Sequence, residues 1–162
     1  MRRITVKFLL AISLAGMLAG CGFQLRGQSS LPFAAAYVDA PAGMLGDRLR
    51  KYLAGKNKLQ EKREAAEVVI SLSGEQRNKS ILSLSGAGKV REYRLVRKVT
   101  LAAATPGGQE LLRPAEIHVV REYSYSDDQV LAKEAEEALL QRDMEDELLR
   151  QAVRRLNLIK LP

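Results

Sequence analysis

The stretch KVREYRLVRKVTLAAA, residues 89–104, decides the fold, because it is the longest run of alternating apolar and polar residues in this chain. One side of an extended backbone collects its apolar side chains, which are Tyr93, Leu95, Val99 and Leu101. The opposite side collects Glu92, Arg94, Lys98 and Thr100. A period of two over this length predicts a β-strand with one face in a core and the other in water.

Three other segments predict strands that extend this one into a sheet. EVVISLSGEQ at 67–76 and AEIHVVREYSY at 115–125 alternate in the same way. A short extended segment at 34–38 predicts a first strand, which Pro41 ends.

The connections between these strands are marked by small and turn-forming residues. TPGG at 105–108 predicts a hairpin turn. On the other side of the central strand, residues 80–88 end in SLSGAG and predict an exposed loop. Ile81 and Leu82 would then lie exposed on that loop.

Two segments have the period of a helix. MLGDRLRKYLAGKN at 44–57 places Leu45, Leu49, Tyr52 and Leu53 on one face, before a stop at Gly55. The second helix begins at SDDQ, residues 126–129, which is a capping box whose two acids suit the helix dipole. It runs nearly to the end of the chain with one apolar stripe, predicted as Leu131, Ala135, Ala138, Leu149, Ala152 and Leu156.

The order β-α-β-β-β-α predicts an α/β (α+β) two-layer sandwich. Two helices would pack on one face of a largely antiparallel four-stranded sheet, because each element has one apolar face to bury. The other face of the sheet would be polar and free to meet a partner.

Composition narrows the class of protein. The 162 residues suit a single domain. One cysteine excludes an internal disulfide, a CxxC redox pair and a cysteine-rich zinc site. No tryptophan, three Phe and five Tyr leave few platforms for stacked bases, which argues against a nucleic-acid partner.

The N-terminus has the layout of a lipoprotein signal peptide over residues 1–20. MRRITVK is basic, FLLAISLAGML is apolar but short for a membrane span, and Leu18-Ala19-Gly20-Cys21 resembles the bacterial lipobox. Cys21 would become the lipidated first residue of the mature chain, because its thiol takes the diacylglycerol thioether. Removing residues 1–20, which carry three basic side chains and no acid, lowers the formal charge from +7 to about +4.

The remaining domain organisation is simple. Residues 21–33 would form a lipidated N-terminus and tether, and residues 34–162 a single domain. Gly22 stands where an Asp would favour retention at the inner membrane, so the sequence permits export to the outer membrane.

The sequence holds little of the chemistry that an enzyme needs. His118 is the only histidine and lies on the polar side of a predicted strand. Asp127 is explained by the capping box. No cofactor or metal is therefore predicted, because common zinc sites need a second histidine or a usable thiol.

Basic residues dominate the central strands. Between Glu75 and Glu122 there are nine, against five acids: Arg77, Lys79, Lys89, Arg91, Arg94, Arg97, Lys98, Arg113 and Arg121. They predict a positive sheet face and hairpin tip. Two interpretations stay open, which are a solvated face that aids solubility and a site for phosphate or carboxylate groups.

Three motifs make the chain similar to the LptE family of lipopolysaccharide-assembly lipoproteins. They are CGFQLRG at 21–27, LSLSGAGKVREYRL at 82–95 and the long segment REYSYSDDQ…RQAVRRL at 121–156. The resemblance covers essentially the whole mature chain in the right order.

That resemblance implies a non-enzymatic lipoprotein, anchored at the periplasmic face of the outer membrane. It would plug and help to assemble the LptD β-barrel and bind lipopolysaccharide. Cys21 maps to the lipidated position, and Ile81 and Leu82 to a contact with the barrel. The candidate lipopolysaccharide ligands are Lys89, Arg91 and Lys133, followed by Arg94, Arg97 and Lys98.

Two other functions fit the same residues without the resemblance. One is an unrelated lipoprotein adaptor or pilot for another envelope complex. The other is a periplasmic enzyme acting on lipid or cell wall, whose activity would depend on His118 or Asp127.

Overall fold

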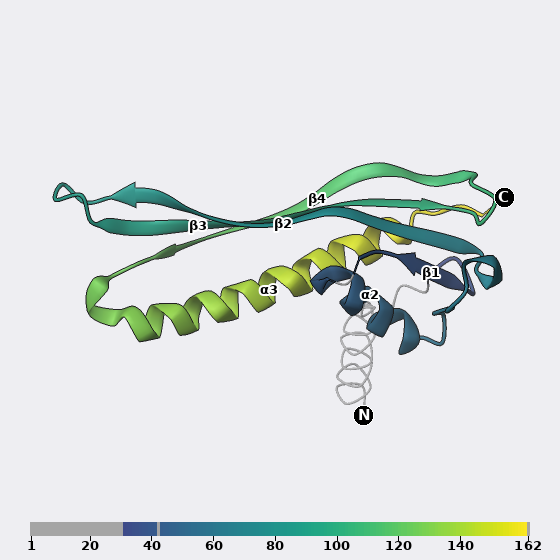
Figure 1. Cartoon of the computed structure of the whole chain (residues 1–162), viewed down its shortest axis with the longest axis horizontal. Helices are drawn as coiled ribbons and strands as arrows, with labels where there is room; N and C mark the ends of the chain where they lie inside the picture. The colour runs from purple at the N-terminus through teal and green to yellow at the C-terminus, as the bar shows by residue number, and fades with distance from the viewer. Residues whose placement is uncertain (1–30, 42, 162) are drawn as a thin grey trace, which may run out of the picture.

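The computed structural model describes residues 31–41 and 43–161, and it confirms the predicted two-layer architecture (Figure 1). The elements in chain order are β1 (Ala36–Asp39), α2 (Met44–Ala54), β2 (Val68–Leu84), β3 (Val90–Ala104), β4 (Glu110–Ser124) and α3 (Val130–Leu156). Short 3-10 turns cover Arg63–Ala65 and Asp127–Gln129. Within the described ranges, none of the helices combines the length and apolar character that crossing a membrane requires.

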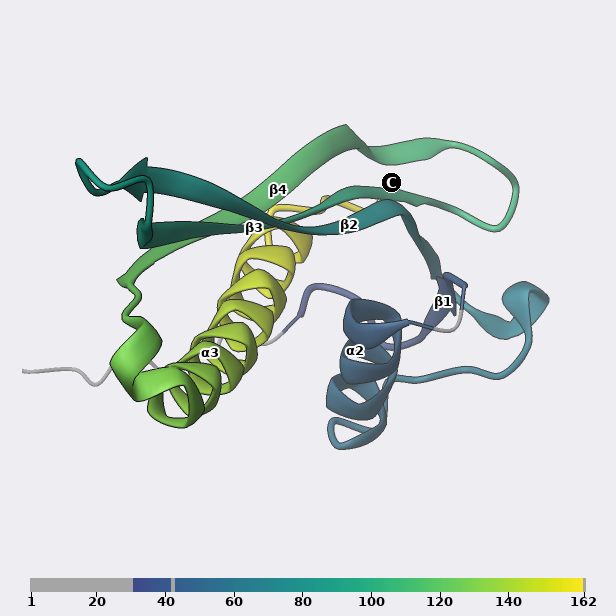
Figure 2. The same ribbon diagram turned by 60° about the vertical axis from the view of Figure 1, so that its left-hand side comes forward.

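The four strands form one sheet in the order β1-β2-β3-β4. β1 runs parallel to β2, and the two long hairpins are antiparallel. Both helices lie on the same side of this sheet (Figures 1 and 2). The opposite side, called the open face below, is covered by no described element.

The core lies between the sheet and the helices, as the apolar periodicity predicts. α2 contributes Leu45, Leu49 and Leu53, all essentially inaccessible, and β3 contributes Leu95, Val99 and Leu101. Each fully buried side chain of this size stabilises the fold by about 1.5–3 kcal/mol. This packing fixes which face of each strand is turned inward.

β2 is longer than the sequence predicts, and the loop predicted at residues 80–88 is wrong for its first half. Ile81 and Leu82 belong to β2, which pairs with β3 as far as Leu84. The turn is confined to the next few residues, where Ser85 N donates to Lys89 O at 2.7 Å and Gly88 takes a φ of 75°. This part of β2 is mostly exposed, so backbone pairing with β3 makes it a strand without an apolar pattern to mark it.

The predicted stripe of α3 is correct only in the C-terminal half of the helix. Ala152 and Leu156 are buried, whereas Leu131 is 84% exposed, and Ala135 and Ala138 are exposed too. α2 has only 11 residues against 27 in α3, and its Arg48 meets α3 at Glu145 and Asp146. α2 is thus too short to reach the N-terminal half of α3, and the side of α3 that it covers near Glu145 is exposed to solvent near the start of the helix.

Candidate functional site

The three best ligand candidates from the sequence gather at one end of the molecule. The tip of the β2–β3 hairpin and the start of α3 lie at the same end (Figure 1), and Tyr125 N donates to Arg91 O at 2.7 Å. Lys89 Nζ lies 3.5 Å from Asp127, and Lys133 Nζ donates to Ser124 Oγ at 3.1 Å. We call Lys89, Arg91 and Lys133 the distal cluster.

Two shallow depressions flank the distal cluster and share Arg91 and Tyr125. One, of about 560 Å³, is lined by Ser83, Leu84, Arg91, Glu92, Ser124 and Tyr125. The other, of about 180 Å³, is lined by Ser85, Lys89, Val90, Arg91, Tyr125, Ser126, Asp127 and Asp128. Their openness to solvent suits a large headgroup better than a small substrate that must be enclosed.

The members of the distal cluster differ in how far their charge is already neutralised. Lys133 is mostly buried and also contacts Glu136 at 2.8 Å. Lys89 is largely exposed beside Asp127. Arg91 is exposed and has no carboxylate within ion-pair distance among residues 31–41 and 43–161. Arg91 is thus the member with the most capacity for an external anion, since its guanidinium can donate two parallel hydrogen bonds.

Arg94 and Lys98 lie on the open face, away from the distal cluster. Each faces a carboxylate on β4, with Arg94 Nε 2.9 Å from Glu122 and Lys98 Nζ 3.2 Å from Glu116. Glu92 shares the same side of β3. The prediction of a positive sheet face is therefore wrong, because the cross-strand register places acids next to its cations.

Arg97 does not belong to any exposed surface. It lies on the same side of β3 as Leu95 and Val99, its exposed fraction is 1%, and it pairs with Glu145 of α3 at 2.8 Å. Its place in the ligand set came from its charge alone, whereas its position in the alternation puts it in the core. The predicted contact residues lie on β2, with Ile81 54% exposed and Leu82 half-buried.

A second polar cluster, which the sequence did not predict, joins the hairpin to α3. Lys79 Nζ lies 2.6 Å from Glu137 Oε2 and 4.0 Å above the centre of the Tyr93 ring. Tyr123 donates its hydroxyl to the same carboxylate oxygen at 2.7 Å and stacks on Tyr93 with ring centres 5.7 Å apart. We call Lys79, Tyr93, Tyr123 and Glu137 the lysine–tyrosine cluster; finding it requires the strand register, which places Tyr93 opposite Tyr123.

Its hydrogen bonds hold the cluster in its charged form. Burial raises the pKa of Glu137, but hydrogen bonds from Lys79 and Tyr123 outweigh burial, so this pKa lies below its ordinary value. Burial lowers the pKa of Lys79, but the bond to Glu137 and the attraction between the two charges raise it above its ordinary value. The pKa of Tyr123 is raised by its own burial and by Glu137.

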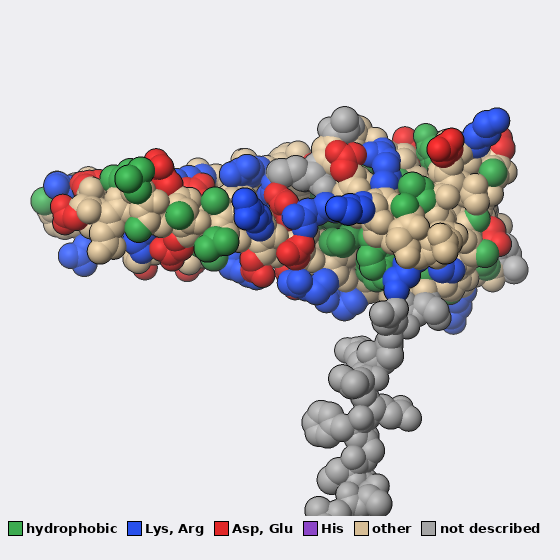
Figure 3. Space-filling view, turned by 90° about the horizontal axis from the view of Figure 1, so that it is seen from below, with side chains coloured by type: hydrophobic (Ala, Val, Ile, Leu, Met, Phe, Trp, Pro, Cys, Tyr) green, Lys and Arg blue, Asp and Glu red, His purple; other side chains and the backbone are tan. Residues whose placement is uncertain are grey.

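Other strand cations also pair with carboxylates of α3. Arg121 forms an ion pair with Asp143 at 2.7 Å, and Arg97 forms one with Glu145, which also pairs with Arg48 of α2. Basic and acidic side chains accordingly alternate along the helix-bearing side of the molecule (Figure 3). Three of the nine basic residues, Lys79, Arg97 and Arg121, therefore serve as counter-charges for this helix.

His118 and Asp127, on which an enzymatic activity would depend, do not lie in an enclosed site. His118 is exposed on the open face, with Nδ1 3.9 Å from Glu116, and Asp127 pairs with Lys89. Within residues 31–41 and 43–161, no three potential metal ligands come together.

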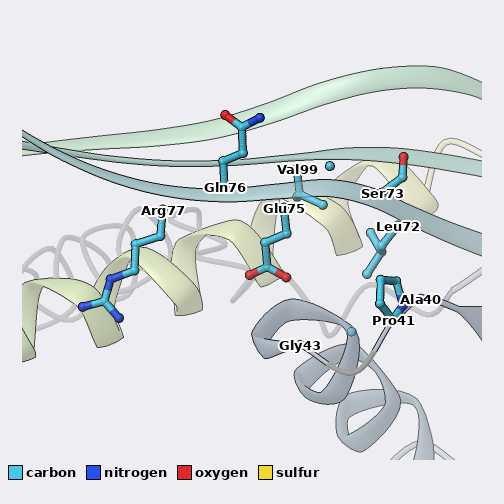
Figure 4. A pocket seen from close by; sticks show the side chains of 11 residues that line it. Ala40, Pro41, Gly43, Leu72, Ser73, Glu75, Gln76, Arg77 and Val99 are labelled. Carbon is cyan, nitrogen blue, oxygen red and sulfur yellow. The ribbon is translucent and has the colours of Figure 1, made fainter.

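A further pocket, of about 500 Å³, lies between residues 72–77 of β2 and the start of α2 (Figure 4). Glu75 points toward Gly43 and accepts from Leu45 N at 3.4 Å, so its carboxylate caps the helix, whereas Arg77 points away. This pocket therefore offers no convergent catalytic groups.

Comparisons with known proteins indicate a family for this chain. The family model LptE, described as lipopolysaccharide-assembly, matches residues 32–156. The LPS-assembly lipoprotein LptE of Photorhabdus laumondii is 29% identical over 161 residues, covering 96% of this chain and 87% of that protein. The LPS-assembly lipoprotein LptE of Yersinia enterocolitica is 28% identical, with coverages of 96% and 77%.

A solved structure has the same fold. The solution structure of an uncharacterized lipoprotein B from Nitrosomonas europaea superimposes with a TM-score of 0.74 at 38% identity, covering 84% of this chain and 90% of that one. The match includes the arrangement of two helices on one face of a four-stranded sheet.

Proposed function

The chain belongs to the LptE lipopolysaccharide-assembly family, and from that premise we propose that it is a non-enzymatic outer-membrane lipoprotein of the lipopolysaccharide transport machinery. In this role it binds lipopolysaccharide while plugging and helping to assemble the LptD β-barrel. Its anchor is Cys21 at the periplasmic face of the outer membrane. Cys21 and the signal peptide before it lie outside the described residues.

The observation that carries ligand binding is the distal cluster. Lipid A and the inner core of lipopolysaccharide carry phosphates, and Lys89, Arg91 and Lys133 present cations of the kind that hydrogen-bond to phosphate. Arg91 is the central contact because its guanidinium is exposed and lines both depressions. Arg94 and Lys98 are secondary, since a ligand must compete there with Glu122 and Glu116.

The partner role is supported by the exposed end of the hairpin. Ile81 and Leu84 are each more than half exposed, and they lie near the tip on β2. Apolar side chains at an extended tip suit insertion into a partner lumen better than free solution. Among the described residues, no group of side chains is arranged as a catalytic site would require.

The test of ligand binding is a double charge reversal, Lys89→Glu with Arg91→Glu. We expect the affinity for purified lipopolysaccharide to fall at least about tenfold, because attraction becomes repulsion at both positions. The measurement is titration of the folded chain with lipopolysaccharide, with circular dichroism to show that the fold is kept.

The matched control reverses two exposed cations far from the hairpin tip, Arg113→Glu with Lys160→Glu, and changes the net charge equally. Equal losses in both double variants would mean that net charge, and not the distal cluster, drives binding. The partner is tested separately by purifying the chain from outer membranes in mild detergent, where recovery of a soluble adaptor complex in place of a large β-barrel would contradict the proposal.

A further inference from the structure

The sheet has three edges at which another strand could pair: the outer edges of β1 and β4, and the part of β2 beyond β1. They differ in how many of their outward backbone groups already have a hydrogen-bond partner. Tyr125 N donates to Arg91 O, and bonds alternate along an antiparallel ladder. Odd-numbered residues of β3 therefore bond to β4 and even-numbered ones to β2. On β4 the even-numbered residues from 116 to 124 turn their N–H and C=O groups outward.

The outer edge of β4 is partly covered, because three of its outward carbonyls accept from side chains. Arg155 donates to Glu116 O and Gln151 to His118 O, each at 3.3 Å, and Arg121 donates to Val120 O at 3.0 Å. Pro114, further along the same edge, has no N–H to offer. These are features that prevent another strand from pairing.

The outer edge of β1 is partly covered as well. Ala36 N donates to Lys58 O at 2.7 Å, and Ala36 O accepts from Gln60 N at 2.8 Å. Arg50 donates to Val38 O at 3.3 Å. Three of the four outward groups of Ala36 and Val38 are therefore occupied by the chain itself.

The third edge, on β2 beyond β1, is different. β1 covers only Val68–Ser71, and a bulge between Ser73 and Gln76 changes which residues turn outward. Gln76, Asn78 and Ser80 are paired with even-numbered residues of β3.

It follows that Arg77, Lys79 and Ile81 each turn one N–H and one C=O away from the sheet. Among residues 31–41 and 43–161, nothing bonds to these six groups. Figures 1 and 2 show the hairpin reaching well past β1 and α2.

We propose that the outer edge of β2 from Gln76 to Ile81 is a docking site that takes an extended segment of a partner polypeptide as a fifth strand. Unpaired N–H and C=O groups at strand spacing are met in full only by another extended backbone. The other two edges of the same sheet are partly occupied by the chain's own groups, and this contrast supports the assignment. The inference rests on the proposed function, in which that polypeptide is the β-barrel partner.

Charge indicates what kind of segment fits. Arg77 and Lys79 lie on the helix-bearing side of this edge, and Arg77 has no ion pair among the described residues. A segment with a carboxylate opposite Arg77 would complement it. A second copy of this chain fits poorly, because antiparallel pairing centred on Lys79 would place two Lys79 side chains opposite each other.

The experiment compares amide hydrogen exchange in the free chain and in its purified complex with the barrel, at single-residue resolution. We expect the amides of Arg77, Lys79 and Ile81 to exchange at least about tenfold more slowly in the complex. Asn78 and Ser80 serve as internal references, because their amides are already bonded to β3. A purified complex in which the three outward amides exchange as in the free chain overturns this inference and leaves the proposed function standing, whereas failure to obtain any complex overturns both.

A proline variant tests the same edge through affinity. Arg77→Pro removes one outward N–H and is expected to weaken the complex about tenfold, since a lost hydrogen bond and a steric clash act together. Arg77→Ala separates loss of charge from loss of the donor and is expected to cost less than about threefold. Glu122→Pro removes an outward N–H from the β4 edge as a matched control, and an equal loss there would contradict the assignment to β2.

Discussion

At the scale of single residues, Arg97 is a charged residue at a position of β3 that is as buried as its apolar neighbours Leu95 and Val99. Leu95 and Val99 flank it on the inward side of β3, so its guanidinium is buried with them. Glu145 forms ion pairs with Arg97 at 2.8 Å and with Arg48 at 2.9 Å. A buried cation in such a place is tolerated only while its carboxylate is present.

The two partners of this ion pair should therefore respond unequally to substitution. Glu145→Gln leaves the Arg97 guanidinium buried without its carboxylate, and we expect it to lower the free energy of unfolding by about 3–5 kcal/mol. Arg97→Met leaves Glu145 with Arg48 and fills much of the same volume, so a loss below about 2 kcal/mol is expected. Urea unfolding at pH 7 measures both, and equal losses would show that Arg97 does not depend on Glu145.

At the scale of elements, α3 combines two environments in one helix. Its second half packs under the sheet and beside α2, with Leu148 and Leu156 fully buried. Its first half contacts the sheet through the lysine–tyrosine cluster and leaves Leu131 and Leu139 largely exposed. Local periodicity is the same in both halves, so the difference comes from which neighbours are long enough to reach them.

Truncation of leucines along α3 tests this division. Leu148→Ala removes a fully buried side chain, and we expect a loss of about 2–5 kcal/mol. Leu139→Ala, at a position 64% exposed, is expected to change the free energy of unfolding by less than about 0.5 kcal/mol. A comparable loss at both positions in urea unfolding would contradict the exposure of the first half.

At the scale of the whole molecule, ion pairs join the sheet to α3. Between the sheet and α3, burial of Glu137 is outweighed by hydrogen bonds from Lys79 and Tyr123, which hold its pKa below the ordinary value. Within α3 itself, hydrogen bonds from Arg154 and then Arg150 hold the pKa of Glu147 below its ordinary value. A lowered folded-state pKa stabilises the fold above the unfolded value of 4.5, and that contribution is lost as pH falls through the folded value. The raised pKa of Lys79 acts at the other limit, where its contribution is lost above about pH 10.5.

Stability should accordingly be constant near neutral pH and fall below about pH 4.5. Glu137→Gln removes one of the responsible carboxylates, so we expect its loss of roughly 1 kcal/mol at pH 7 to shrink toward zero at pH 3. Urea midpoints across this range, for the unmodified chain and the variant, provide the measurement. A loss that stays constant with pH would mean that the carboxylate acts only through packing.

The element order, the fold class and the inward face of β3 follow from the amino-acid sequence, because they depend on local periodicity and turn chemistry. Lys89, Arg91 and Lys133 are also predicted as ligand candidates from motifs contiguous in the chain, and their role stays a prediction. The register between the strands could not be predicted from the sequence, because it depends on contacts between residues that are far apart in the chain.

The three-dimensional arrangement was needed to show that Arg97 is a core residue. The same is true of the carboxylates beside Arg94 and Lys98, and of the contact between Lys79 and Glu137. The same holds for the length of β2 and the bare half of α3. Each of these features depends on a contact between elements that are far apart in the sequence. The residues next to a basic residue on a strand do not show whether its side chain meets a ligand, solvent or a carboxylate from the other layer of the fold.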